Sequence, residues 1–316
     1  MGLMDESNIV RRKLSPALVR ARRNYQLYLL LLAPMVWLVI FQYVPMYGVI
    51  VAFKSFRADL GILWSPWVGL RHFERFFRSY YFERTVINTI VLSAYGLVAA
   101  FPMPIILALA MNSSLRRKFT RTVQFITYMP YFISTVVLVG MILEFLNPRV
   151  GLLNMARQTL GLQSMDFMAR PELFRHIYVW SGIWQNAGWG TIIYLAALAG
   201  IDPELHEAAT CDGANRLRRI IHIDLPGILP TITILLILNL GTIISIGFEK
   251  AFLMQNPLNL ATSEVISTFV YKVGLAASVP NFSYGAAIGL FLSVINFGMI
   301  ALVNAVAKRI GETSLW

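Results

Sequence analysis

A mostly polar segment, residues 207–226, carries the residues whose types and spacing are best suited to chemistry. Its sequence is EAATCDGANRLRRIIHIDLP, and it lies between two long apolar runs. The carboxylate of Glu207 can pair with a basic group or a helix N-terminus of another protein. The adjacent Ala208 and Ala209 are small enough to let the backbone of a partner approach closely. This chemistry is recognition rather than catalysis, so the segment is a candidate docking surface.

The residues around this segment predict two short helices separated by a turn. Asp202 can cap free backbone N–H groups and Pro203 suits the first helical position, so a helix is expected to begin near Pro203. Gly213 stands where the chain must turn through left-handed backbone angles. A second short helix is expected over 214–222, and Pro226 then begins the next apolar helix. The alternative interpretation is a solvated connector whose arginines only mark one side of a membrane.

The composition places the flanking elements in a membrane. Of the 316 residues, 57% are hydrophobic and 14% are charged, and the mean hydropathy of +0.63 is outside the usual range of soluble domains. An α-helix needs roughly 20 apolar residues to cross a hydrocarbon core. Six runs are long enough and lack the alternation of barrel strands: 24–53, 85–115, 122–143, 177–201, 225–248 and 273–307. We therefore expect an all-α integral membrane protein with six transmembrane helices.

Prolines interrupt several of these runs. They are Pro34, Pro45, Pro102, Pro104 and Pro130. In a membrane such breaks persist where neighbouring helices or a water-filled cavity satisfy the freed backbone carbonyl. The prolines are therefore compatible with a transport path and equally with simple packing kinks.

Several other classes of function find no support in the sequence. The formal net charge is +11, but the basic residues are spread along helix ends rather than gathered into a nucleic-acid-binding patch. Phosphate-binding loops, HExxH patterns and paired Cys and His at metal spacing do not occur, so we expect neither catalytic residues nor a metal or cofactor site in this chain. The lone cysteine, Cys211, excludes an internal disulfide. The first apolar run is too long for a signal-peptide h-region and is expected to be a retained span.

Basic residues in short loops orient the helices. Six basic residues precede the first apolar run, and the loop 116–121 holds four without an acid. Both segments are expected on the cytoplasmic side, which places 207–226 and the C-terminus there as well. Residues 54–84 must then lie outside, although they carry six basic residues that three acids only partly offset.

One membrane domain accounts for the chain, because no repeat, low-complexity region or second soluble domain is visible. The expected organisation is a basic cytoplasmic tail at 1–26, a transmembrane domain at 27–310 that contains an outer segment at 54–84 and a cytoplasmic loop at 201–226, and a C-terminal tail at 311–316. In the outer segment, aromatic residues at three- and four-residue spacing predict one amphipathic helix. They are Phe73, Phe76, Phe77 and Tyr80. This helix is expected to lie in the outer interface or to pack across the tops of the spans.

The 207–226 segment resembles a family motif. Its pattern of EAA, three residues, Gly, nine residues, Ile, one residue and Leu-Pro is similar to the EAA loop of permease subunits in type I binding-protein-dependent ABC importers. The matching residues are Glu207, Ala208, Ala209, Gly213, Ile223, Leu225 and Pro226. The resemblance implies the type I ABC importer permease fold and a coupling helix that docks in a cleft of a cytoplasmic ATPase. It also implies that ATP and Mg are bound by the partner ATPase subunits, so this chain is not itself an enzyme.

Further matches over almost the full length resemble carbohydrate permeases of the LplB type. They lie at 41–53, 68–73, 88–89, 129–134 and 312–316. The resemblance implies an oligosaccharide importer of the bacterial inner membrane that works by alternating access. Its implied partners are a second homologous permease, favouring a heterodimer over a homodimer, two ABC ATPase subunits and an extracytoplasmic solute-binding protein. Members of this subgroup import uronate-containing oligosaccharides such as alginate or pectin fragments. An acidic sugar is therefore one of the cargoes that the resemblance implies.

Two other functions remain open on the sequence. An ABC permease for a non-sugar solute would carry the same loop, because the loop contacts the ATPase and not the cargo. A secondary transporter would instead predict ion-coupling carboxylates at mid-membrane and an internal repeat, and neither is visible.

Sugar sites commonly pair aromatic faces with amides and hydroxyls, and two spans offer such groups. The candidates in the fourth run are Trp180, Trp184, Gln185, Asn186 and Trp189. An aromatic belt at the outer interface is the alternative, but it explains the tryptophans better than the amides. In the fifth run, Asn239, Thr242 and Glu249 form a polar stripe, with Asn239 near the midplane. Glu249 and its neighbour Lys250 are expected near the outer rim, where the two charges could simply be interfacial.

Overall fold

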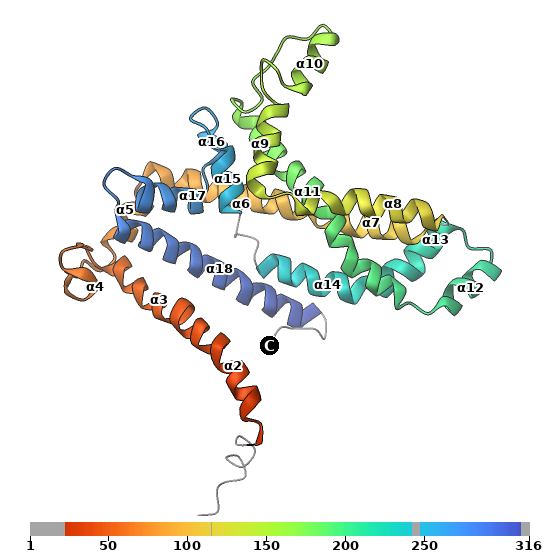
Figure 1. Cartoon of the computed structure of the whole chain (residues 1–316), viewed down its shortest axis with the longest axis horizontal. Coiled ribbons are helices and arrows are strands. Elements are labelled where there is room, and N and C mark those ends of the chain that lie inside the picture. Colours follow the sequence, from red (N-terminus) through yellow and green to blue (C-terminus); the bar gives the residue numbers. More distant parts are fainter. Residues whose placement is uncertain (1–22, 115, 242–246, 311–316) are drawn as a thin grey trace, which may run out of the picture.

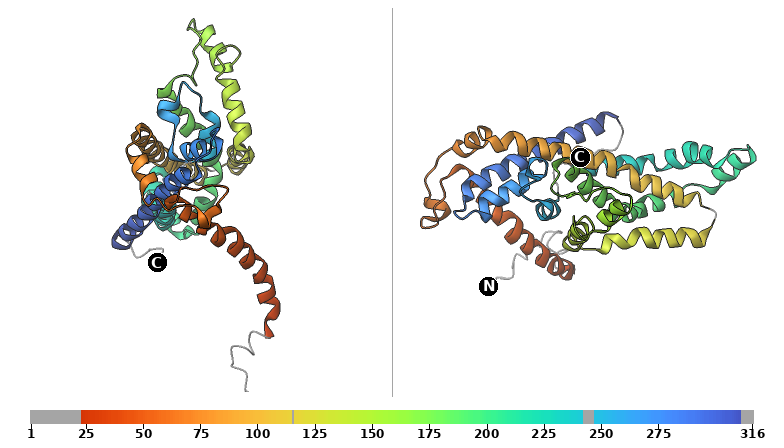
Figure 2. Two further views of the ribbon diagram at one scale, coloured as in Figure 1. Left: turned by 90° about the vertical axis from the view of Figure 1, so that its left-hand side faces the viewer. Right: turned by 90° about the horizontal axis from the view of Figure 1, so that it is seen from above.

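The computed structural model describes residues 23–114, 116–241 and 247–310. Within these ranges the chain forms helices and no strand, with one isolated bridge between Lys54 and Trp67. Most of the long helices run along one axis of the molecule (Figure 1), and the view from above in Figure 2 shows the same alignment. The predicted all-α fold class is confirmed.

Four helices of the described chain are long and apolar enough to cross a membrane. They cover Tyr25–Phe53, Tyr80–Asn112, Arg216–Gly241 and Phe282–Leu302. A bent pair of helices adds a fifth crossing if it is counted as one span. The remaining predicted span lies in α11 (Pro171–Ala199), which has 29 residues but carries Glu172, Arg175 and His176 in its first turns. Length and composition therefore give four or five crossings rather than the six expected.

The first apolar helix is assembled from four pieces. They are α2 (Tyr25–Leu38), the π-helical turn η1 (Val39–Tyr43), α3 (Val44–Met46) and the 3-10 helix η2 (Tyr47–Phe53). Helix α2 has no buried residue and leans away from the other helices in Figure 1. By contrast, η2 packs against α18 (Phe282–Ile310). The apolar surface of α2 therefore needs cover from lipid or from another subunit.

The third apolar run is broken. Its pieces are α8 (Arg117–Tyr128), the 3-10 turn η3 (Met129–Phe132) and α9 (Thr135–Phe145). The arms 117–132 and 135–145 meet at 100°, because Ile133 and Ser134 between them have extended backbone angles. The hydroxyl of Ser134 restarts the helix by accepting a hydrogen bond from Val137 N at 3.3 Å. The span predicted over 122–143 is therefore present as two helices at a sharp angle, and it counts as one crossing only if the bent pair is taken as a broken span.

One of the six basic residues of the outer segment, Lys54, has a structural role. Lys54 is buried, and its Nζ donates to the carbonyls of Ile62 at 2.9 Å and Leu63 at 2.8 Å. These carbonyls belong to α4 (Gly61–Trp64), whose C-terminal end favours a cation. This lysine thus serves the fold of the outer segment, which reduces the conflict with the basic-residue rule.

The predicted amphipathic helix of the outer segment is divided between two helices. α5 (Arg71–Phe77) ends before Tyr80, which instead begins α6 (Tyr80–Ala100). Phe76 is 1% exposed and meets aromatic rings of several helices, including Phe269 and Phe291. Helix α5 therefore packs across the ends of neighbouring helices, which is one of the two predicted placements. Tyr80, by contrast, is exposed.

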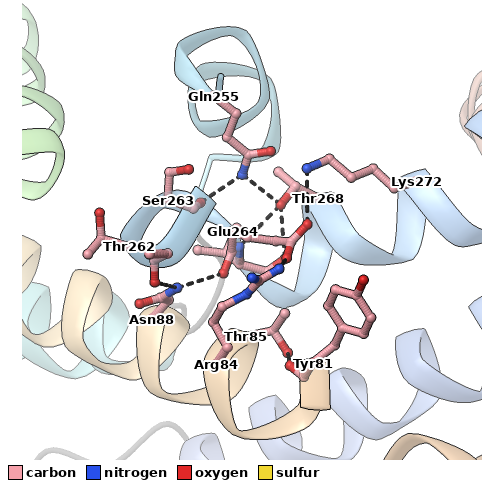
Figure 3. Close-up of polar contacts among 12 residues, drawn as sticks. Tyr81, Arg84, Thr85, Asn88, Gln255, Thr262, Ser263, Glu264, Thr268 and Lys272 are labelled. Carbon is pink, nitrogen blue, oxygen red and sulfur yellow. Dashed lines mark hydrogen bonds and ion pairs between the residues drawn. The ribbon is translucent and has the colours of Figure 1, made fainter. Parts of the chain in front are cut away.

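A buried polar cluster ties the N-terminal part of α6 to the segment that precedes α18 (Figure 3). The carboxylate of Glu264 pairs with Arg84 and, at 3.0 Å, with Lys272. Asn88 Nδ2 donates to the backbone carbonyl of Glu264 at 3.1 Å. The elements joined are α15 (Phe248–Met254), α16 (Leu260–Ser263), α17 (Ile266–Tyr271) and η5 (Lys272–Ala276). Arg84 is therefore a second basic residue of the outer segment with a structural partner.

Helix α11 is the centre of the fold. Its buried apolar residues contribute to two core clusters, one shared with α6, α9 and α15 and the other with α7 (Pro102–Asn112) and α14 (Leu225–Gly241). The remaining helical pieces are α10 (Leu152–Thr159), α12 (Pro203–Cys211), α13 (Arg216–Arg219) and the π-helical turn η4 (Ile220–Asp224). Figure 1 shows α12 at one end of the molecule and α4 and α5 at the other.

Candidate coupling surface and transport cavity

The helix predicted from the polar segment is present as α12. Asp202 Oδ1 accepts a hydrogen bond from the backbone N–H of Glu204 at 3.0 Å, and Pro203 occupies the first position. Gly213 has a φ of +76°, which residues with a Cβ rarely adopt. The helix start at Pro203 and the glycine turn are therefore confirmed.

The second predicted helix differs from the structure in length. Asn215 caps α13 by accepting from Arg218 N at 2.9 Å, and the chain then continues through η4 into α14 without a break. The fifth apolar helix thus begins at Arg216 and not at Pro226. Pro226 fits within this helix because the π-helical turn η4 just before it interrupts the regular i to i−4 backbone hydrogen bonds.

The motif residues of α12 face away from the rest of the chain. Glu207 and Ala208 are exposed, Ala209 is half-buried and Gly213 is exposed. Glu207 forms no ion pair within the described ranges. Further on, Ile223 is half-buried, while Leu225 and Pro226 are exposed. This geometry leaves the carboxylate and the small residues of α12 accessible to a partner at one end of the molecule.

Side-chain contacts tie α12 to the helices behind it. His206 Nε2 lies 3.3 Å from Asp224 Oδ1, and Asn112 Nδ2 donates to the same oxygen at 3.3 Å. Asp224 is 3% exposed. Arg219 Nη1 donates to the hydroxyl of Thr210 at 3.0 Å. A displacement of α12 would therefore reach the ends of α7 and α14 directly. Sequence reasoning missed Asp224, whose only signal is an acid placed at the edge of an apolar run.

A cavity of about 550 Å³ lies between α6, α7, α11 and α14. Two residues of its wall are Gly96, at the centre of the Tyr80–Asn112 helix, and Gln185, at the centre of α11. The cavity is therefore at mid-depth of the helix bundle. Its lining is mostly apolar with a few polar groups, which is the usual composition of a small-molecule site.

Three of the predicted path residues line this cavity: Gln185, Asn186 and Asn239. Gln185 Nε2 also donates to the carbonyl of Ile133 at 2.8 Å. This carbonyl lies at the bend of the third run, so Gln185 satisfies a backbone group that the break leaves without a helical partner. One wall residue of the cavity therefore holds the α8–α9 bend in place.

The three predicted tryptophans do not line the cavity. Trp180 Nε1 donates to the hydroxyl of Tyr95 at 3.0 Å, and Trp189 stacks on Tyr131 with ring centroids 4.5 Å apart. Trp184 is 51% exposed. The three tryptophans are thus partly exposed on α11 and lie outside the cavity wall.

The polar stripe predicted in the fifth run does not form on one helix. Gly247 has a non-helical ψ of 99° and precedes α15, so Glu249 belongs to a different helix from Asn239. Glu249 is exposed and does not line the cavity. Thr242 lies outside the described residues.

Lys250, expected near the outer rim, reaches the cavity instead. It is 8% exposed, and its Nζ donates to the carbonyl of Tyr178 at 2.8 Å. The ammonium also lies 4.7 Å from the centroid of the Tyr178 ring. Sequence reasoning could not place this residue, because its environment depends on how α15 packs against α11.

A second cavity, of about 530 Å³, lies at the outer segment, and basic residues form part of its lining. They include Arg71, His72 and Arg75. His72 Nε2 lies 3.1 Å from the carbonyl oxygen of Lys54. Burial lowers the pKa of His72, and the positive charges of Arg75 and Arg71 lower it further. The end of the molecule opposite α12 thus presents a positive surface whose charge comes from its arginines.

Apolar spanning helices around a mid-depth cavity, with an exposed polar helix at one end, define a membrane transport component. Residues 100–312 match the family described as binding-protein-dependent transport system inner membrane component, and the chain belongs to this family. It is a permease component and not an enzyme.

Two relatives from Bacillus subtilis (strain 168) resemble almost the full chain. The polygalacturonan/rhamnogalacturonan transport system permease protein YteP is 40% identical over 299 residues, covering 95% of this chain and 92% of that protein. Protein LplB is 39% identical over 295 residues, covering 93% and 92%. The resemblance to LplB-type permeases predicted from the sequence is confirmed.

Two crystal structures share the fold, each with a TM-score of 0.86. One is a bacterial ABC transporter involved in the import of the acidic polysaccharide alginate, with 39% identity and coverage of 93% of this chain and 99% of that chain. The other is a bacterial alginate ABC transporter in complex with an alginate pentasaccharide-bound periplasmic protein, with 38% identity and coverage of 94% and 98%. The predicted type I ABC permease fold is confirmed.

Proposed function

We propose that this chain is one of two transmembrane subunits of an ATP-driven importer that carries an acidic oligosaccharide across a bacterial inner membrane. The observation that carries the cargo class is the similarity, over at least 93% of the chain, to proteins named for polygalacturonan, rhamnogalacturonan or alginate transport. All three of these polymers are rich in uronates. The cavity at mid-depth supplies a place for such a cargo to pass.

The coupling surface of this importer is α12. Two cytoplasmic ATPase subunits bind ATP and Mg²⁺, and one of them receives Glu207, Ala208 and Ala209 in a cleft. Closure of the ATPases then displaces α12, and the contacts of His206 and Asp224 transmit this displacement to α7 and α14. Alternating access of the cavity follows from this motion.

Two further partners complete the assembly. A second, homologous permease covers the apolar surface of α2, which has no buried residue in this chain. A solute-binding protein delivers the cargo to the outer end, and the arginines of the outer segment complement an acidic ligand there. The periplasmic protein in one of the alginate transporter structures supports this partner. Both termini, including the basic tail at 1–26, lie on the cytoplasmic side.

The coupling assignment is tested by co-expression with the ATPase subunits and the second permease. Glu207→Arg reverses the docking charge and Gly213→Pro disrupts the turn after α12, so both variants should lose ATPase subunits on purification and lose uptake of oligogalacturonate into proteoliposomes. Glu204→Arg is the matched control, because Glu204 is an exposed acid of the same helix outside the motif. Unchanged assembly and uptake in both motif variants would refute the assignment.

A further inference from the structure

Lys250 is a buried cation that has no carboxylate partner in the part of the chain that the structure describes. It is 8% exposed. A charged side chain inside a membrane protein is costly to bury, and such residues normally pair with another charge or mark a substrate path. The position of Lys250 in the wall of the mid-depth cavity favours the second explanation.

The surroundings of the ammonium keep it directed at the cavity. Among the described residues, one hydrogen bond of Lys250 Nζ is present, to the carbonyl of Tyr178 at 2.8 Å, and it uses one of the three N–H donors. Gly182 supplies the space that the ammonium occupies, because a Cβ on this residue would lie 3.2 Å from Lys250 Nζ. The remaining donors are therefore available to a ligand in the cavity.

We propose that Lys250 binds a carboxylate of the transported oligosaccharide and is the residue that selects acidic over neutral sugars inside the permease. The amides of Gln185 and Asn186 lie in the same wall and suit the hydroxyl groups of the sugar. The cavity of about 550 Å³ is within the range of roughly 300–1,000 Å³ typical of ligand sites. The inference rests on the proposed function and adds a site of selectivity to it.

A carboxylate ligand explains the ammonium better than a neutral sugar does. Amides and hydroxyls satisfy neutral sugar hydroxyls without burying a charge, whereas a cation in a low-dielectric site gains most from an anion. The ammonium of lysine is also compact and sits on a flexible stem. A small displacement of this stem therefore lets the ammonium follow the carboxylates of successive sugar units.

The test measures direct binding to the purified importer, with both permeases and the ATPase subunits but without the binding protein. The probes are trigalacturonate and its methyl ester, which has the same sugar units without the negative charges. Lys250→Gln should weaken trigalacturonate binding by roughly 10- to 100-fold, the range expected for a hydrogen bond between charged groups, and leave binding of the ester unchanged. Lys250→Arg should restore most of the affinity. Lys308→Gln, which removes an exposed lysine of α18, is the matched control.

A second pair of variants tests the geometry without touching the lysine. Gly182→Ala crowds the ammonium and should weaken trigalacturonate binding selectively. Gly140→Ala is its control, because Gly140 lies on α9 outside the cavity lining and a Cβ there meets no atom within 4 Å.

Three outcomes would overturn the inference. Equal losses for both probes would make Lys250 a structural residue. Loss of permease pairing in Lys250→Gln would show that a carboxylate of the second permease neutralises the ammonium. Unchanged binding of both probes would remove Lys250 from the site. Failure of the proposed function is distinguishable, because the wild-type chain would then not copurify with ATPase subunits or would bind neither probe.

Discussion

Gly213 shows how a single residue defines the end of the coupling surface. Its φ of +76° lies in the left-handed region, where a residue with a Cβ is destabilised by roughly 1–2 kcal/mol. Gly213→Ala should therefore loosen the end of α12 and speed backbone hydrogen exchange there, and Gly213→Asn should do so less, because asparagine tolerates these angles. Gly48→Ala is the control, since Gly48 has ordinary helical angles and open space at the Cβ position. Equal exchange in the alanine and wild-type proteins would contradict this role.

Some of the individual site residues could be predicted from the sequence and others could not. Asp202, Pro203 and Gly213 act on backbone groups within a few residues of themselves, so their roles follow from local rules. Lys250 and Asp224 depend on contacts with helices that are distant in sequence. Local patterns contain no information about such packing, so the sequence could not show that Lys250 is buried.

At the scale of the elements, the contact between α12 and the base of α14 is the proposed route of coupling. Asp224→Asn keeps a hydrogen-bond acceptor for Asn112 but removes the charge that faces His206. The substitution should weaken the contact by about 1–3 kcal/mol, so ATPase subunits still assemble while fewer sugars are imported per ATP hydrolysed. The ratio of uptake to ATP hydrolysis in proteoliposomes measures this effect. Asp212→Asn, an exposed acid in the same loop, should leave the ratio unchanged, and an unchanged ratio in Asp224→Asn would exclude the route.

The cluster around Glu264 joins α6 to η5 (Figure 3). Glu264→Gln leaves Arg84 and Lys272 close together without their carboxylate, and breaking a buried pair in this way costs about 3–5 kcal/mol. A lower thermal unfolding temperature in detergent is expected. Asp59→Asn removes the exposed pair with Arg57 and should cost about 0–1 kcal/mol. Equal unfolding temperatures for the two variants would show that the cluster does not hold these elements together.

The third apolar run shows the limit of predicting elements from hydropathy. Residues 122–143 are apolar enough for a span, and Pro130 predicts a kink but not its angle. The 100° bend depends on Ser134, which restarts the helix, and on Gln185 of α11, which binds the freed carbonyl region. The bend is thus fixed by a contact between helices, and composition detects only the total apolar length.

At the scale of the whole molecule, α12 and the outer segment lie at opposite ends (Figures 1 and 2), so the orientation of the chain decides whether the coupling proposal is correct. Cys211, the single cysteine of the sequence, is exposed on α12 and reports on this end. A membrane-impermeant maleimide should label it in inverted vesicles and not in right-side-out vesicles. In a Cys211→Ser background, Asp59→Cys should show the opposite pattern, because Asp59 is exposed in the outer segment. Assembly with the ATPase subunits should protect Cys211, since the proposed cleft covers α12. Labelling of Cys211 from outside would place α12 beyond the reach of any cytoplasmic ATPase and would refute the coupling role of the whole segment.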